Sequence, residues 1–199
     1  AVYLPQITIL HRHMNTIIQN QRKERDELLA RHYLMRKSNT DVKTLLDNPM
    51  IKLITGPRRV GKSTYALLML QGKSFAYLNF DDNLLLSAWD EELVMRTLDE
   101  VYPNYEFLLL DEVQNLKDWD VWVSKLYRRG KNLVITGSNA KMLSGEMATV
   151  LTGRYLQVEM LPFSLTETIE WKGANINSIS NAKQAEAVAM ADDYLRNGG

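Results

Sequence analysis

The sequence has no cysteine and no excess of charge of either sign. Disulfides and thiolate metal sites are therefore excluded, and a cysteine-free composition fits the cytosol. Lys+Arg and Asp+Glu are both 24, so the net charge is zero. A neutral chain gives no general case for nucleic acid or a membrane as partner. We expect a cytoplasmic globular protein whose function depends on local motifs.

Long apolar runs are also missing. The longest ones, such as residues 107–110, have the length of a strand, whereas a membrane span needs about 18 apolar residues. The first ten residues lack the pattern of a signal peptide. The chain ends at Gly198-Gly199 directly after a helical pattern. We therefore expect a piece of a longer protein.

The charged and histidine residues near the start allow two interpretations. Between His11 and Lys37, seven Lys or Arg residues stand against three acidic ones, which leaves +4. A solvated helical face is the favoured interpretation of this run, and a nucleic-acid contact is the alternative. The spacing of His11, His13 and His32 matches no metal site, so we expect exposed histidines on a helix.

Periodicity divides the chain into three parts. Residues 1–47 form an N-terminal helical segment, with helices expected over 17–35 and 42–46. Residues 48–172 alternate between short apolar strands and amphipathic helices, and residues 173–199 form a helical extension that starts a lid or second domain. The expected strands are 51–55, 75–80, 107–110, 133–136 and 155–160, and the expected helices are 64–70, 90–102, 119–129, 140–151, 165–171 and 182–195. Such alternation predicts an α/β fold with three layers, α/β/α, and a mainly parallel sheet. The sequence GPRRVGKS at residues 56–63 makes this the P-loop NTPase architecture.

A phosphate-binding motif follows the first strand. Residues 56–63 read GPRRVGKS and match G-x-x-x-x-G-K-[ST] between a strand and a helix. Glycines let the backbone N–H groups turn inward toward phosphate oxygens, Lys62 neutralises the β- and γ-phosphates, and Ser63 binds Mg²⁺. Arg58 and Arg59 approach phosphate or a neighbouring subunit, or are exposed loop cations. The expected ATP-binding residues are Gly56, Pro57, Arg58, Arg59, Val60, Gly61, Lys62, Ser63 and Thr64.

Two carboxylates end the third strand. Asp111 and Glu112 follow the apolar run 107–110. Ligands of parallel sheets bind beyond the carboxyl ends of the strands, so Asp111 is expected near the phosphate loop, where it holds Mg²⁺. Glu112 is placed to orient and polarise the attacking water.

The fourth strand ends in small polar residues. Thr136, Ser138 or Asn139 is expected to bind the γ-phosphate or the attacking water, while a helix cap by Ser138-Asn139 is the alternative. Downstream, Arg154 stands just before the fifth strand. It either reaches the ATP of a neighbouring subunit, which implies a homo-oligomer, or forms a structural ion pair.

In this order, the motifs resemble those of AAA+ ATPases. GPRRVGKST resembles the Walker A motif, FLLLDEVQ the Walker B motif, VITGSNA the sensor 1 segment and ATVLTGRY the arginine-finger segment. DEVQNLKDW and LTGRYLQVEMLPFSLTE are typical of a bacterial and archaeal group in which the AAA domain precedes a second domain of undefined function. The resemblance covers about residues 45–171. It implies that Glu112 activates water, Asn139 or Ser138 senses the γ-phosphate, and Arg154 acts in trans.

The expected function is Mg²⁺-dependent ATP hydrolysis that drives conformational change in attached domains or partners. The alternative is a slowly hydrolysing, ATP-dependent switch or scaffold in signalling or DNA-associated processes. A small-molecule kinase is disfavoured, because adjacent Asp111 and Glu112 suit hydrolysis. ATP is expected rather than GTP, since no N/T-K-x-D pattern follows downstream.

Overall fold

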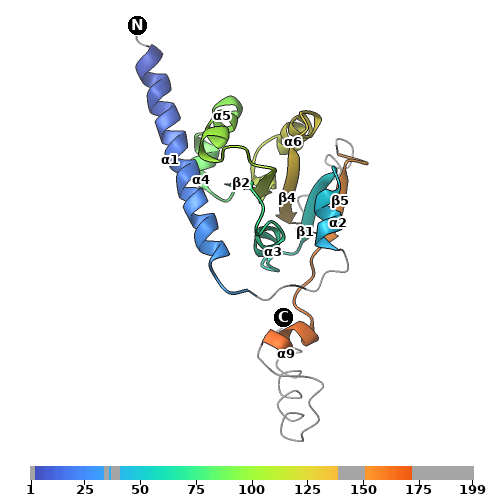
Figure 1. Ribbon diagram of the computed structural model, residues 1–199. Coiled ribbons are helices and arrows are strands. Elements are labelled where there is room, and N and C mark those ends of the chain that lie inside the picture. Colours follow the sequence, from blue (N-terminus) through green and yellow to red (C-terminus); the bar gives the residue numbers. More distant parts are fainter. Residues whose placement is uncertain (1–2, 34–35, 37–40, 139–150, 172–199) are drawn as a thin grey trace, which may run out of the picture.

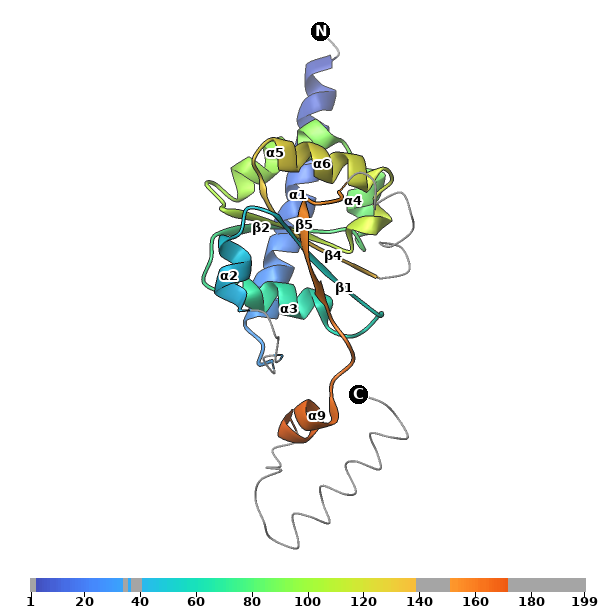
Figure 2. The same ribbon diagram turned by 90° about the vertical axis from the view of Figure 1, so that its right-hand side faces the viewer.

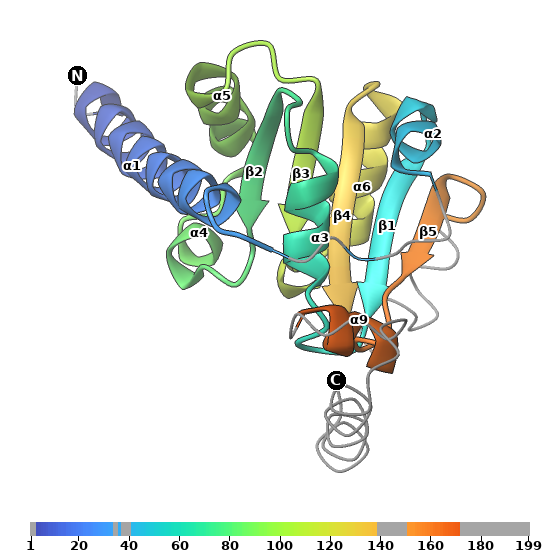
Figure 3. The ribbon, with the colours of Figure 1, turned by 60° about the horizontal axis from the view of Figure 1, so that its bottom comes forward.

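A computed structural model of the chain describes residues 3–33, 36, 41–138 and 151–171. Within these ranges, five parallel strands form one sheet in the order β2-β3-β4-β1-β5. Their bounds are β1 Ile51–Gly56, β2 Phe75–Asn79, β3 Phe107–Asp111, β4 Asn132–Ser138 and β5 Tyr155–Glu159. All arrowheads in Figure 3 point to the same edge of the sheet. The predicted parallel sheet is confirmed, and each predicted strand lies within two residues of an observed one.

Helices cover both faces of the sheet and one of its edges. Figure 2 shows α5 and α6 on one face and α2 and α3 on the other, which confirms the three-layer prediction. The helices and the one 3-10 helix of the described ranges are α1 Tyr3–Leu29, α2 Val42–Asp47, α3 Lys62–Met69, α4 Asn83–Ser87, α5 Glu91–Val101, η1 Val113–Asn115, α6 Trp119–Arg128 and α9 Leu165–Trp171. The helices predicted over 140–151 and 182–195 lie outside the described residues.

Alternating strand residues supply two separate cores. Leu108, Leu110 and Ile135 face the core shared with α1, α5 and α6, whereas Leu109 and Val134 face the core shared with α2 and α3. Every residue of β1 and of β3 is buried. Strands covered on both faces have continuous apolar sequences, and this is why those runs identified them.

The N-terminal helix was predicted from residue 17, but it begins at Tyr3. Its lower half lies along β2, the edge strand (Figure 1). There the Gln21 side chain exchanges two hydrogen bonds with the Asn79 backbone, of 3.0 and 3.2 Å. Arg25 donates to the Phe75 carbonyl at 2.6 Å. These side chains satisfy strand groups that no neighbouring strand reaches, so α1 protects the open edge.

Two short elements, α4 and η1, are not among the predicted ones. Both are too short to show a helical period. Asp82 caps α4 by accepting from the Leu84 N–H, and α4 leads into an aromatic cluster. There Trp89 meets Trp122 edge-on, at 4.9 Å between ring centroids. Trp119 and Trp122 are buried on α6, as its periodicity predicts.

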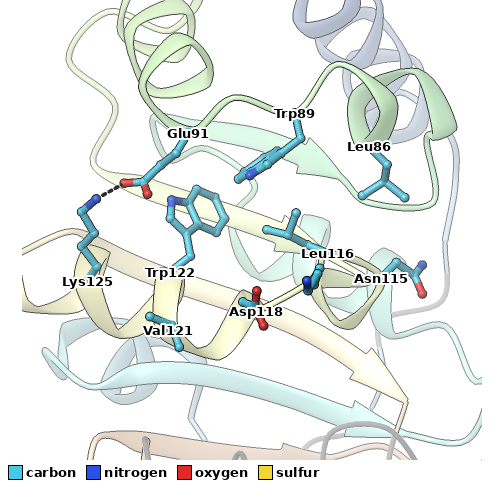
Figure 4. Close-up of a pocket in the computed structure, with 10 residues that line it drawn as sticks. Leu86, Trp89, Glu91, Asn115, Leu116, Asp118, Val121, Trp122 and Lys125 are labelled. Atoms are coloured by element: carbon cyan, nitrogen blue, oxygen red, sulfur yellow. Dashed lines mark ion pairs between the residues drawn. The ribbon is translucent and has the colours of Figure 1, made fainter.

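A groove lies over this cluster, between α4 and α6. Its volume is about 610 Å³, and Leu86, Trp89, Leu116 and Trp122 contribute its apolar lining (Figure 4). At one end an ion pair of 2.6 Å joins Lys125 on α6 to Glu91 on α5.

None of the helices in the described ranges is both long and apolar enough for a membrane span.

One cation lies inside the sheet. Lys52 on β1 is fully buried, and its Nζ donates to Asn132 Oδ1 at 2.6 Å. Its ammonium also lies 5.6 Å from the centroid of the Phe107 ring. Burial lowers the pKa of Lys52 to about 8, because the charged form loses its hydration.

We expect Lys52→Met to raise the free energy of unfolding at pH 7 by roughly 1–3 kcal/mol. The folded-state pKa lies below the unfolded value, so the unfolded chain binds more protons between about pH 8 and 10.5, and wild-type stability rises through that window. The advantage of the variant should therefore disappear by about pH 10. Urea denaturation at pH 7 and pH 10 measures both effects, with exposed Lys73→Met as the matched control. An advantage of equal size at both pH values would contradict a buried ammonium.

Candidate nucleotide-binding site

The phosphate loop connects β1 to α3 at the carboxyl edge of the sheet (Figure 3). Gly56 has φ +152°, and a Cβ there would lie 2.2 Å from the Met160 carbonyl oxygen. Gly61 has φ +85° and stands at the start of α3. Glycine adopts the positive φ of both positions without strain, and at Gly56 any side chain would clash with this carbonyl. The loop therefore has the backbone of an anion-binding turn, followed by the positive end of a helix.

Lys62 is the first residue of α3, and its side chain is buried. Its Nζ donates to the Pro57 carbonyl at 3.0 Å, and it lies 3.5 Å from Glu112 Oε1. The Lys62 ammonium thus lies between the start of the phosphate loop and the Glu112 carboxylate, which follows β3. Exchange of the Pro57 carbonyl for a phosphate oxygen would preserve one strong hydrogen bond.

Asp111 lies at the end of β3 and is buried, as predicted beside the phosphate loop. Ser63 Oγ donates to Asp111 Oδ1 at 2.8 Å, and Tyr77 donates to Oδ2 at 3.3 Å. Thr136 also donates to this carboxylate. Burial raises the pKa of Asp111, and the hydrogen bonds from Thr136 and Ser63 oppose this rise.

These oxygens form a donor set that fits a hard divalent cation. Ser63 Oγ and the Asp111 carboxylate are in contact at the mouth of the loop. Such oxygen ligands suit Mg²⁺, which is usually held by few protein groups together with phosphates and water. Among the described residues there is no cluster of three or more His, Asp or Glu side chains that would hold a metal ion without a phosphate.

Glu112 follows directly in a left-handed conformation, with φ +51°. Its backbone N–H donates to Thr136 Oγ1 at 2.9 Å, which anchors the turn to β4. Its side chain accepts a hydrogen bond from Gln114 and faces Lys62. A left-handed conformation is uncommon for a residue other than glycine at the end of a strand. Here it lets the successive carboxylates of Asp111 and Glu112 both face the phosphate loop.

The polar end of β4 lies beside the two carboxylates. The Thr136 hydroxyl contacts Asp111 and Glu112, so it organises the carboxylates. Ser138 is paired with Gly56 in the parallel register and therefore lies beside the first loop residue. Asn139 lies outside the described residues.

Arg154 lies at the other edge of the sheet. It directly precedes β5, and its carbonyl accepts from the Ile51 N–H at the start of β1. Its guanidinium donates to Ser124 Oγ on α6 at 3.2 Å. A strand length thus separates Arg154 from the phosphate loop of its own chain. Arg58 and Arg59 are exposed on the loop.

Three further residues of the site, Tyr77, Gln114 and Arg36, carry no local sequence signal of their role. Tyr77 is an ordinary strand aromatic in sequence, and Gln114 belongs to an element too short to recognise. The interpretation of the N-terminal charges as a solvated face is wrong for two of them, since the side chains of Arg36 and Arg25 are 14% and 12% exposed. Both bind backbone carbonyls of distant segments, which charge patterning does not reveal.

Comparison with known proteins gives consistent matches. An AAA domain family matches residues 48–169. An uncharacterized protein of Methanocaldococcus jannaschii is 36% identical over 167 residues, which are 81% of this chain and 38% of the relative. An uncharacterized protein of Haemophilus influenzae is 34% identical over 144 residues, covering 66% of this chain and 36% of the relative. The chain therefore spans less than two fifths of either relative's length.

A solved structure extends the comparison to a distant protein. The cryo-EM reconstruction of Hsp104 in its closed state, with ATPγS and FITC-casein, has a TM-score of 0.48 and 18% identity. The match covers 65% of this chain and 27% of that one. The family match, by contrast, spans most of the chain and includes the phosphate loop and both strand-end carboxylates. This chain belongs to the AAA-domain family of P-loop ATPases.

Proposed function

We propose that this domain binds ATP with Mg²⁺ and hydrolyses it, and that hydrolysis drives conformational change in attached domains or partners. One observation carries the proposal: Lys62, Asp111 and Glu112 meet at a single loop with phosphate-binding geometry. Family membership supports the same assignment.

The loop amides and Lys62 would bind the phosphates, and Ser63 and Asp111 would hold Mg²⁺. A Mg²⁺ ion held by these two residues would supply positive charge that offsets the negative charge on the phosphates during transfer. Ser63 and Asp111 are already in contact, so the donors require little reorganisation. Hydrogen bonds from Thr136 and Tyr77 keep the Asp111 carboxylate oriented.

Glu112 would orient the attacking water and accept its proton. The left-handed turn fixes the backbone of Glu112, and Gln114 holds one of its carboxylate oxygens. Once a phosphate draws Lys62 away, the other oxygen is available to a water molecule. In this role Glu112 exchanges its ion pair with Lys62 for a hydrogen bond with water, while its backbone stays in place.

Arg154 would act on the nucleotide of a neighbouring copy. Its position at the opposite edge of the sheet separates it from its own phosphate loop. Because Arg154 lies far from the phosphate loop of its own chain, an isolated chain would lack its help. This favours a second candidate function for the isolated chain, namely a switch that binds ATP and hydrolyses it slowly. Assembly distinguishes the two, since Arg154 of a neighbouring copy would add a cation to the nucleotide site.

Lys62→Ala should weaken ATP binding by about 10–100-fold or more, because a charge-assisted hydrogen bond is lost from a buried site. Isothermal calorimetry with ATP and Mg²⁺ measures the change. Lys117→Ala, an exposed lysine outside the loop, is the control. Wild-type affinity in the Lys62 variant would sink the site assignment.

Glu112→Gln should lower the turnover number by about 10²–10⁴-fold while ADP affinity stays within about threefold. The amide keeps the shape and the Gln114 contact but cannot accept the proton. Steady-state phosphate release and ADP calorimetry separate the two effects, and exposed Glu106→Gln is the control. Unchanged turnover would show that another group activates the water.

Turnover per chain should rise steeply with protein concentration if Arg154 acts in trans. In a mixed assay, Arg154→Ala should be inactive alone, and adding Lys62→Ala chains should restore activity. The restored sites pair an intact loop with an intact arginine from the neighbour. A rate independent of concentration, together with no complementation, would instead support the slow switch.

A further inference from the structure

Arg36 joins three segments that are far apart in sequence. It follows α1, and its guanidinium donates to the Leu161 carbonyl at 2.8 Å and to the Val60 carbonyl at 3.3 Å. It also pairs with Glu167 on α9 at 2.9 Å. The Phe163 ring covers the guanidinium, with 4.3 Å between Cζ and the ring centroid. The polar groups that Arg36 contacts thus belong to the phosphate loop, the segment after β5, and α9.

The contact with Val60 bears on the geometry of phosphate binding. Val60 and Gly61 share one planar trans peptide, in which the C=O and N–H point in opposite directions. Arg36 holds the Val60 carbonyl on one side of the loop. The Gly61 N–H is therefore directed away from Arg36, and under the proposed function it would donate to a phosphate oxygen. Rotation of this peptide would replace a phosphate donor by a carbonyl oxygen.

The contact with Glu167 extends to the start of α9. Ser164 and Glu167 form a capping box, in which the Ser164 N–H donates to Glu167 Oε2 at 2.8 Å and the Glu167 N–H donates to Ser164 Oγ at 3.2 Å. Arg36 binds the other oxygen, Oε1. The Glu167 side chain is 7% exposed, so its pairing with Arg36 takes place away from bulk solvent. Loss of Arg36 would remove this ion pair from a carboxylate that is largely shielded from solvent.

We propose that Arg36 is a positioning residue that couples nucleotide binding at the phosphate loop to the seating of α9. This inference rests on the proposed function. One guanidinium stabilises both the phosphate-competent Val60–Gly61 peptide and the capped start of α9. Coupling between two sites is reciprocal, so bound nucleotide tightens α9, and displacement of α9 weakens nucleotide binding by the same factor. Binding or loss of nucleotide thereby changes how firmly α9 is held after β5.

The test compares ADP binding in Arg36→Met, Arg36→Lys, Glu167→Gln and the Arg36→Met/Glu167→Gln double variant by calorimetry. Arg36→Met should weaken binding by about 10-fold and Glu167→Gln by about threefold, with no further loss in the double variant. Arg36→Lys keeps the charge but not the forked geometry, so it should recover only part of the affinity. Arg31→Met, an exposed arginine of the same segment, is the matched control.

A second readout separates coupling from a general structural role. Hydrogen exchange of residues 165–171 should slow when ADP binds the wild type and should not respond to ADP in Arg36→Met or Glu167→Gln. Circular dichroism and thermal melts identify any variant that does not fold, and Arg36→Lys or Glu167→Gln then replaces Arg36→Met. Wild-type ADP affinity, or retained protection of α9 by ADP, in a folded variant would overturn the inference. Absence of ADP binding by the wild type would instead overturn the proposed function.

Discussion

The buried carboxylate of Asp111 joins the elements from which the site is built. It accepts hydrogen bonds from Ser63 on α3, Tyr77 on β2 and Thr136 on β4, while its own strand supplies the chain leading to Glu112. A buried carboxylate is tolerated only where such donors surround it. The same arrangement therefore stabilises the end of the sheet and orients the oxygens that would hold a cation.

The phosphate loop is held by contacts on two further sides. At its start, Gly56 lies so close to the Met160 carbonyl that no side chain fits. At its end, Arg36 binds the Val60 carbonyl. Both contacts reach the segment that leaves β5 and continues toward α9. Two contacts thus join the phosphate loop to the downstream chain, and the proposed coupling between nucleotide binding and α9 depends on them.

The candidate site residues lie at two opposite ends of the parallel strands. Phosphate-binding and carboxylate groups gather at the carboxyl edge, whereas Arg154 lies at the amino edge, held by Ser124. A parallel sheet separates residues before a strand from residues after one by the full length of the strand. An arginine in that position serves a second molecule or a structural role, and assembly determines which. At the protected side edge, α1 places Gln21 and Arg25 on β2 and so blocks pairing with another strand.

Much of this was accessible from the sequence alone, for identifiable physical reasons. Strands buried on both faces have continuous apolar runs, and the β1–α3 turn needs two glycines, a lysine and a hydroxyl at set spacing, so the α/β fold, the phosphate loop, Asp111 and Glu112 were predicted. These signals are local. Contacts across long sequence separation leave no periodic trace, and only the tertiary structure placed Tyr77 and Thr136 on Asp111 and Arg36 between the loop and α9. Packing likewise decided that α1 seals the sheet and that Arg154 lies far from its own phosphate loop.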